Sequence, residues 1–142
     1  MQPDAEKVLI YATSGARLLV FDEPDFPEVE LQVPGGTVEA NEAIEVAARR
    51  EFFEETGLEG GNFVALGVNG YRFSTKDRNI YHRRHYFHVE LSGPLPETWL
   101  HSEDTPYSGG PPIVFRLFWI GIAEAASRLG YGMGNQVFRL GH

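Results

Sequence analysis

The sequence predicts an α/β fold in which a mixed β-sheet lies between helices. Three observations support this class. Short runs rich in β-branched and aromatic residues recur along the chain, one long segment rich in Ala and Glu contains no Gly or Pro, and a shorter helix-like segment follows the last β-rich run. The expected order, ββ–β–α–ββ–β–α, suits a sheet sandwiched by helices. A chain of 142 residues can bury about two-thirds of its unfolded surface, so we expect one domain, residues 1–142.

The expected strands are bounded by turn-forming residues. They are, in order, residues 7–13, 17–21, 29–33, 62–73, 80–91 and 113–119. Ser14-Gly15 joins the first two into a hairpin, and Pro34-Gly35-Gly36 closes the third. Residues 94–112 are rich in Gly, Pro and acids, so we expect a loop there. Loops of that length tend to be functional or mobile.

Two helices are expected, over residues 42–56 and 122–129. The first has Asn41 or Thr37 as a candidate cap at its start, and Gly57 ends it. The tail after residue 129 gives no clear signal.

Composition and charge exclude several classes of protein. The formal net charge of −8 disfavours a nucleic-acid partner, because nucleic-acid binders usually carry a basic face. Without cysteine there is no disulfide framework and no thiolate metal site. The longest apolar stretch, residues 113–126, contains Arg116 and Glu124 and is too short for a membrane span of about twenty residues. The N-terminus lacks the pattern of a secretory signal. We therefore expect a cytoplasmic protein with no membrane partner.

The segment RREFFEETG, Arg49 to Gly57, crowds charge around two phenylalanines. At about 100° per residue, Glu51 and Glu55 fall within the apolar arc of the expected helix. The apolar members of that arc are Ile44, Ala47, Ala48 and Phe52. Val46 and Phe53 lie on the opposite face, which suggests that the helix is covered on two sides.

Two carboxylates on an apolar face are costly unless a cation meets them. Arg50 supplies one positive charge, which does not balance Glu42, Glu51, Glu54 and Glu55 together. One interpretation is a solvated helix face laced with ion pairs. The other is a site for a divalent cation, since hard carboxylate oxygens suit Mg²⁺ or Mn²⁺.

The spacing around this segment resembles the Nudix box, G-x5-E-x7-R-E-U-x-E-E-x-G-U, in which U is a bulky aliphatic or similar residue. All fixed positions are present from Gly36 to Leu58, with Phe52 and Leu58 at the two U positions. So many specified positions at fixed spacing form a far more specific signal than a lone glycine motif. The chain is identified on this basis as a member of the Nudix hydrolase family, which implies a Nudix-type αβα sandwich with a mixed β-sheet.

The resemblance implies Mg²⁺-dependent (or Mn²⁺-dependent) hydrolysis of the diphosphate bond in a nucleoside diphosphate linked to another moiety. The products would include a nucleoside monophosphate or inorganic phosphate. Glu51 and Glu55 would be the principal metal ligands, and Glu54 would assist through the metal or a water molecule. The carbonyl of Gly35 would be a further ligand, because a tight glycine turn leaves its backbone open.

The same resemblance assigns roles to the charged neighbours of these ligands. Arg50 would orient the glutamates by ion pairing, and Glu42 would hold that arginine. Glu51, Glu54 and Arg50 would therefore all serve catalysis. The glycines at the two ends of the box would serve the loop–helix–loop geometry.

The catalytic base in this family comes from the box or from an acid on a distant loop. The expected loop over residues 94–112 offers Glu97, Glu103 and Asp104, with Glu103 as the leading choice, and His101 as a further candidate. The alternative for each acid is a purely solvated loop residue.

A basic patch lies on the expected strand over residues 80–91. Strand alternation places His82, Arg84 and His88 on one face, and Arg83 and His85 on the other, which argues against a three-histidine zinc site. Arg83 or Arg84 could contact a phosphate, although a solvated strand face is the more common outcome.

The substrate is left open by the residues around the box. Candidates for stacking on a base are Tyr71, Phe73, Tyr81 and Tyr86, although strand aromatics are more often core. Phe73 stands where many ADP-ribose hydrolases have a proline. Residues 74–76 include no tyrosine of the kind found there in many diadenosine polyphosphate hydrolases.

The main hypothesis is therefore a pyrophosphohydrolase that acts on a small-molecule nucleotide, as a monomer or homodimer. The alternative is a Nudix-fold sensor that binds a nucleotide without cleaving it. Such sensors usually have eroded boxes, whereas this box is complete. A pyrophosphohydrolase of RNA 5′ ends is disfavoured by the acidic charge balance.

Overall fold

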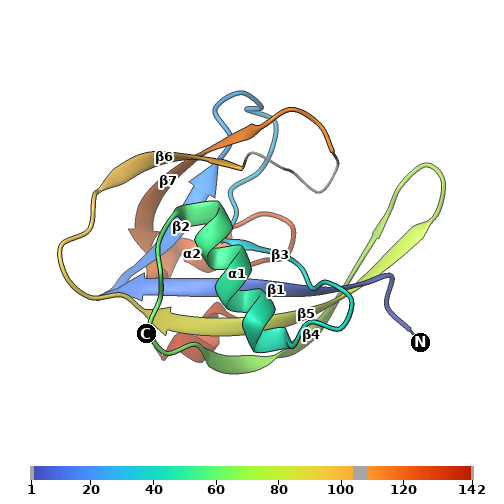
Figure 1. The fold of residues 1–142 in the computed structure, drawn as a ribbon, viewed down its shortest axis with the longest axis horizontal. Helices are drawn as coiled ribbons and strands as arrows, with labels where there is room; N and C mark the ends of the chain where they lie inside the picture. Colours follow the sequence, from blue (N-terminus) through green and yellow to red (C-terminus); the bar gives the residue numbers. More distant parts are fainter. Residues whose placement is uncertain (1, 104–108, 142) are drawn as a thin grey trace.

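The computed structural model describes residues 2–103 and 109–141, and its strands form one mixed sheet (Figure 1). The strands are β1 (Ala5–Ser14), β2 (Arg17–Asp22), β3 (Gly35–Thr37), β4 (Val64–Ser74), β5 (Asn79–Glu90), β6 (Thr98–Glu103) and β7 (Ile113–Gly121). The helices are α1 (Ile44–Thr56), α2 (Ile122–Arg128) and the 3₁₀ helix η1 (Val137–Leu140). The strand order is β4-β5-β1-β2-β7-β6, with β3 paired to β1. The predicted α/β class is confirmed.

The sheet changes partners along β1. Next to the hairpin turn β1 pairs with β2, where Thr13 lies opposite Leu18. Farther from the turn β2 continues along β7, and β3 takes its place beside β1, with Gly35 opposite Leu9. On its other edge β1 runs parallel to β5 over its whole length. The two halves of the sheet therefore diverge from the β1–β2 hairpin, and β3 lies between them.

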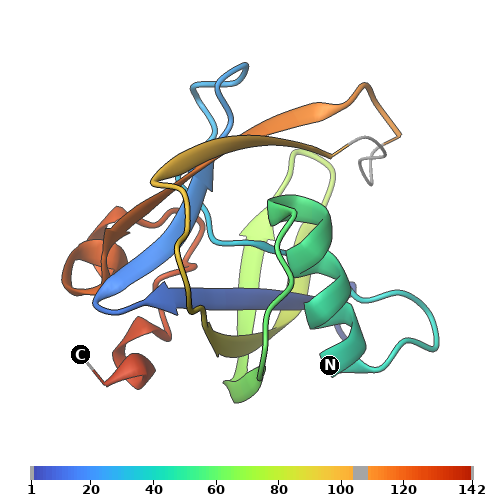
Figure 2. The ribbon, with the colours of Figure 1, turned by 60° about the vertical axis from the view of Figure 1, so that its left-hand side comes forward.

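Apolar side chains fill both faces of the sheet. On one face Val8, Ile10 and Phe87 pack with Ala48 and Phe52 of α1. The other face is covered by α2, by η1 and by the segment between them (Figure 2). The members of this second core include Leu9, Tyr11, Leu18, Val20, Ile122, Ala125 and Val137. The arrangement is the αβα sandwich that the sequence predicts.

Helix α1 agrees with its prediction at the C-terminal end and differs at the start. Gly57 adopts a left-handed conformation, with φ of 77°, and its N–H bonds to the Phe53 carbonyl. At the start, Ala43 takes the cap position without any side-chain hydrogen bond, so the predicted caps are wrong. Val46 and Phe53 are 55% and 52% exposed, so this face of α1 is open in the described structure, contrary to the expected second cover.

The strand expected over residues 29–33 is wrong. Only Gln32 forms a β-bridge, with Phe21, while the Glu30 N–H bonds to the Tyr131 hydroxyl. The short strand lies instead at β3, in the Gly-Gly segment that was expected to close a strand. Glycine weakens strands on its own. Here a close partner, β1, imposes the extended backbone, and a Cβ on Gly35 would lie 2.3 Å from the Val8 carbonyl oxygen.

The loop expected over residues 94–112 contains β6, which pairs along its whole length with β7. Its inward residues include Trp99, whose indole N–H donates to the Thr56 carbonyl at the end of α1 over 2.9 Å. β6 is an edge strand with one neighbour, so its sequence lacks the apolar run of a central strand. Gly and Pro residues on both sides of β6 also made this segment resemble a loop in the sequence.

None of the helices in the described ranges is both long and apolar enough to cross a membrane.

At the edge of the sheet that lies opposite to β6, β4 and β5 extend as a hairpin beyond the remaining strands (Figure 1).

Candidate active site

Two glutamates of α1 are buried where the helix crosses β3. Glu51 and Glu55 lie one turn apart, and each is 8% exposed, whereas Glu54 between them is exposed. The Gly35 N–H donates to Glu55 Oε1 over 2.8 Å. Gly36 leaves room for the other carboxylate, because a Cβ there would lie 2.0 Å from Glu51 Oε2. The glycines of β3 therefore allow two carboxylates to be buried against the sheet.

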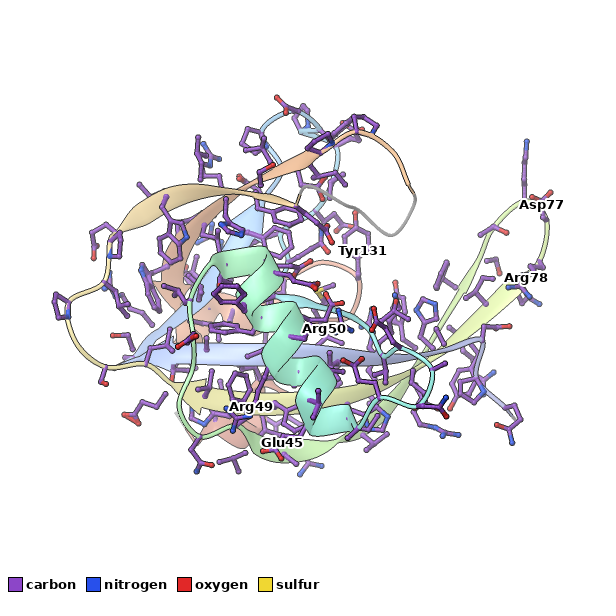
Figure 3. The ribbon with its side chains drawn as sticks, viewed as in Figure 1. Glu45, Arg49, Arg50, Asp77, Arg78 and Tyr131 are labelled. Carbon is purple, nitrogen blue, oxygen red and sulfur yellow. The ribbon has the colours of Figure 1, made fainter. Side chains whose placement is uncertain are left out.

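Arg50 connects these carboxylates to the start of the helix. Its Nε and one terminal nitrogen donate to Glu42 over 2.7 and 2.9 Å. Its other terminal nitrogen donates to Glu51 over 2.7 Å and to Glu54 over 3.1 Å. The guanidinium also donates to the Thr37 carbonyl over 3.0 Å. In Figure 3 Arg50 extends on the side of α1 where Tyr131 also lies, while Glu45 and Arg49 lie on the other side. The predicted pairing of Arg50 with Glu42 is confirmed.

Burial and mutual repulsion change the acidity of this group. Burial raises the pKa of Glu51 to about 7, against the opposing effect of Arg50, and Glu54 and Glu103 raise it further. The pKa of Glu55 is also raised, first by burial and then by neighbouring carboxylates, although the Gly35 N–H opposes the shift. Hydrogen bonds from Arg50 lower the pKa of Glu42 to about 2. Arg50 thus neutralises Glu42 first, whereas Glu51 and Glu55 are harder to ionise, so holding both as carboxylates would need a further cation.

The structure places Glu103 and Glu97, two of the acids expected on the long loop, in different environments. Glu103, at the end of β6, lines the same cleft as the glutamates of α1, and burial followed by Glu54 raises its pKa. Glu97 instead forms an ion pair with Arg17 over 2.9 Å. His101 packs its ring against Gly57 at the end of α1. Asp104 lies outside the described residues. Glu103 is thus the described loop acid that faces the box.

A cleft of about 1160 Å³ opens beside these acids. One wall is acidic and comes from α1, β3 and β6. Further lining comes from β1, β4, β5 and the segment after α2, and its polar and aromatic residues include Lys7, Tyr71, Phe73, His82, Arg84 and Tyr131. Such a volume is that of a small-molecule site.

The basic strand β5 divides as alternation predicts. Arg83 and His85 point to one face and bond to the carboxylate of Glu6 over 3.0 and 2.7 Å. His82 and Arg84 face the cleft, and Arg84 is only 5% exposed. The more common outcome, a solvated strand face, is therefore wrong for Arg84.

Of the stacking candidates, Tyr71 and Phe73 line the cleft, while Tyr86 is buried core. Sequence reasoning missed two cleft residues, Lys7 and Tyr131. Lys7 offered one weak signal, as a lysine in the expected first strand, and Tyr131 offered none.

The donor set suits a hard divalent cation. Its atoms are carboxylate oxygens, two of its side chains are buried, and its negative charge exceeds what Arg50 neutralises. Within residues 2–103 and 109–141, no group of three acidic or histidine side chains is gathered tightly enough to enclose an ion. In this arrangement Arg50 bonds to Glu51 and Glu54, and the Gly35 N–H bonds to Glu55. A cation would therefore compete with these donors.

Comparisons with known proteins agree with this geometry. The family model of the NUDIX domain matches residues 1–130. Over 100 residues, 70% of this chain, the sequence is 34% identical to a Mycobacterium tuberculosis protein named as mutator protein MutT4, of whose length the chain spans 36%. The MutT NUDIX hydrolase of Burkholderia pseudomallei superposes with a TM-score of 0.71 at 17% identity over 99% of both chains. The NUDIX domain of Shewanella oneidensis NrtR, solved with ADP ribose, has a TM-score of 0.67 at 12% identity, covering 99% of this chain and 88% of that one. These two likenesses show the fold.

The raised pKa of Glu51 predicts how stability depends on pH in the presence of a chelator. Its carboxyl binds a proton more tightly in the folded chain, with a pKa of about 7, than at its ordinary value of 4.5. The unfolding free energy should therefore fall as pH rises from about 4.5 to about 7, by up to about 3 kcal/mol from this group. Urea denaturation across this range should show a flatter profile for Glu51→Gln, while Glu45→Gln on the exposed face keeps the wild-type slope. Equal slopes for wild type and Glu51→Gln would contradict the assignment.

Proposed function

The chain belongs to the Nudix family, and on that premise we propose that it is a pyrophosphohydrolase. It would cleave the diphosphate bond of a nucleoside diphosphate linked to another moiety, with Mg²⁺ or Mn²⁺. The observation that carries the proposal is the burial of Glu51 and Glu55 together at one wall of a cleft of about 1160 Å³. Such costly carboxylates are typical of functional sites.

Four residues would hold the cation. Glu51 and Glu55 are the principal ligands, Glu54 assists through the ion or a water molecule, and the Gly35 carbonyl adds an oxygen. Gly35 lies in a strand, not in the tight turn expected from the sequence, but it lines the cleft. When bound, a divalent cation neutralises the anionic diphosphate and lowers the pKa of the water that attacks it.

Arg50 acts as a positioning residue. Its fork of donors is fixed by the bidentate bond to Glu42, which is only 10% exposed at its side chain. The remaining donors then hold Glu51 and Glu54 at a set angle to the cleft. A partly buried arginine with a fixed partner thus keeps mutually repelling carboxylates on one side of the helix.

Glu103 supplies the general base. Its raised pKa makes the carboxylate a better proton acceptor near neutral pH, and it faces the cleft from outside the box. As the water oxygen bonds to phosphorus, its proton passes to Glu103 and the phosphorus bond to the leaving phosphate oxygen breaks. The alternative base is Glu54, which lies nearer to Arg50.

The substrate would be a small nucleotide. The lining of the cleft includes the aromatic residues Tyr71 and Phe73, which suit a nucleoside, and the cleft is larger than a diphosphate needs. ADP ribose in the NUDIX domain of NrtR is one compound of this class. A cytoplasmic location is also part of this proposal, and the absence of cysteine is compatible with it. The enzyme would act as a monomer or homodimer.

A hydrolysis screen that separates and identifies the products by chromatography tests the proposal directly, because cleavage of a nucleotide sugar yields a nucleoside monophosphate and a sugar phosphate without free inorganic phosphate. Nucleoside triphosphates, dinucleoside polyphosphates and nucleotide sugars are incubated with Mg²⁺ or Mn²⁺, and we expect turnover of at least one compound. Ca²⁺ should bind to the hard oxygens without supporting turnover well. Tight binding of a nucleotide without cleavage of any diphosphate compound would reject the enzyme and favour the sensor.

Neutral replacement of either buried ligand should abolish most hydrolysis. Glu51→Gln and Glu55→Gln keep the size of the side chain but remove the charge that would hold the cation, so kcat/KM for the best substrate should fall by at least about 100-fold. Circular dichroism checks that each variant folds, and Glu45→Gln serves as the control on the same helix. A variant that keeps near wild-type turnover shows that its residue does not hold the metal.

The variant Glu103→Gln tests whether Glu103, and not an acid of the box, is the general base. We expect kcat to fall by about 100-fold or more with little change in KM, because a base acts on the chemical step. Glu97→Gln is the matched control, since Glu97 pairs with Arg17 away from the cleft. If both variants turn over alike, the base lies within the box.

A further inference from the structure

Besides Arg50, the lining of the cleft contains three basic side chains. Lys7 comes from β1, and His82 and Arg84 come from β5; we call them together the basic wall. Register places Arg84 beside Lys7 on the parallel strands, so the two side chains are neighbours on one face of the sheet. An acidic chain with a net charge of −8 thus gathers basic groups inside the same cleft that the box glutamates line.

Arg84 is the most informative member. It is 5% exposed, yet among the described residues no carboxylate lies within ion-pair distance of it. One terminal nitrogen donates to the Tyr131 carbonyl over 2.7 Å, and the guanidinium carbon lies 3.7 Å from the centre of the Tyr71 ring. A guanidinium has five N–H donors, so most of its donor capacity is left for another acceptor.

The adjacent Arg83 shows what a structural arginine on this strand looks like. It points to the opposite face, is 38% exposed at its side chain, and forms an ion pair with Glu6 over 3.0 Å. On this strand the more exposed Arg83 is therefore neutralised by Glu6, whereas the buried Arg84 has no carboxylate partner among the described residues. Burial of an unneutralised charge is costly, which favours a ligand as the missing partner.

The rest of the basic wall is held in place beside Arg84. The ammonium of Lys7 donates to the Thr37 hydroxyl over 2.6 Å. Burial lowers the pKa of Lys7, Glu51 opposes that shift, and Arg84, its neighbour in the register of β1 and β5, adds to it. Burial lowers the pKa of His82 as well, with Lys7 and Arg84 as further causes.

We propose that Lys7, His82 and Arg84 bind a phosphate group that the substrate carries in addition to the diphosphate that is hydrolysed. The location of the cleaved diphosphate rests on the proposed function, whereas the basic wall needs no metal to bind an anion. A phosphate fits better than a single carbonyl acceptor, because it has several oxygens for one fork of arginine donors and one ammonium.

Two kinds of nucleotide carry such a group. In one, the phosphate is a further member of a linear chain of three or more. In the other, it is an ester on the ribose of a nucleoside whose 5′ position carries the diphosphate. Phe73 lies beside His82, with ring centres 5.2 Å apart, and offers an apolar surface for the nucleoside in either case.

Calorimetry on the full chain with a chelator and no divalent metal tests the basic wall alone. The probes are matched pairs: tripolyphosphate against pyrophosphate for the linear source, and adenosine 2′,5′- or 3′,5′-bisphosphate against adenosine 5′-monophosphate for the ester source. We expect the more phosphorylated member of at least one pair to bind about 10- to 100-fold more tightly. The pair that shows this preference identifies the source.

Substitutions test whether the basic wall causes the tighter binding of the more phosphorylated probe. Arg84→Gln and Lys7→Met should each reduce it by about tenfold or more, while Arg83→Gln on the opposite face leaves it unchanged. Lys7→Met keeps the test informative if loss of Arg84 unfolds the chain, which thermal melting would show. Equal binding within every pair, or an equal loss in Arg83→Gln, overturns the proposal.

The result is independent of the enzyme proposal. A chain that hydrolyses a diphosphate but shows no preference within any pair retains the proposed function without this subsite. A chain that shows the preference but hydrolyses nothing retains the subsite and loses the proposed function.

Discussion

The structure depends on keeping two carboxylates out of water on the core side of a helix. Glu51 and Glu55 are as buried as many apolar residues, and desolvation raises the pKa of both. They are tolerated because the backbone of β3 supplies an N–H to one, and because Arg50 donates to the other. The absence of a side chain at Gly36 gives the room, so the position of α1 over β3 and the composition of β3 are set by the same requirement.

That requirement explains the shape of the sheet as well. β1 leaves β2 soon after their hairpin and accepts β3 as its neighbour, so the sheet opens where the acids need space. The same opening exposes Lys7 and, on the parallel neighbour β5, Arg84. Acidic side chains from α1 and β6 and the basic side chains of β1 and β5 consequently line one cleft, together with the glycines of β3. This separation of charge suits an anion that meets metal at one end and arginine at the other.

Local patterns were sufficient for most elements but not for all. The β1–β2 hairpin, α1, the pair β4 and β5, β7 and α2 each have their own turn residues and periodicity, and each was predicted from them. The Gly-Gly strand β3 and the edge strand β6 were missed, and a strand was placed wrongly over residues 29–33. In both missed strands the extended backbone comes from a partner far away in sequence, which local propensity does not record.

By itself, the sequence determined the acidic half of the site. A helix repeats every 3.6 residues, so the spacing of Glu51 and Glu55 places both on one face whatever else the chain does. Only the tertiary structure decided which of the two alternating faces of β5 meets the cleft, and so distinguished Arg84 from Arg83. It alone joined Lys7 and Tyr131 to the site, and it placed Glu103, but not Glu97, at the cleft, because these residues come from segments separated by long stretches of chain. Contacts within a helix follow from spacing, whereas contacts between strands depend on pairing and register, which strand alternation does not specify.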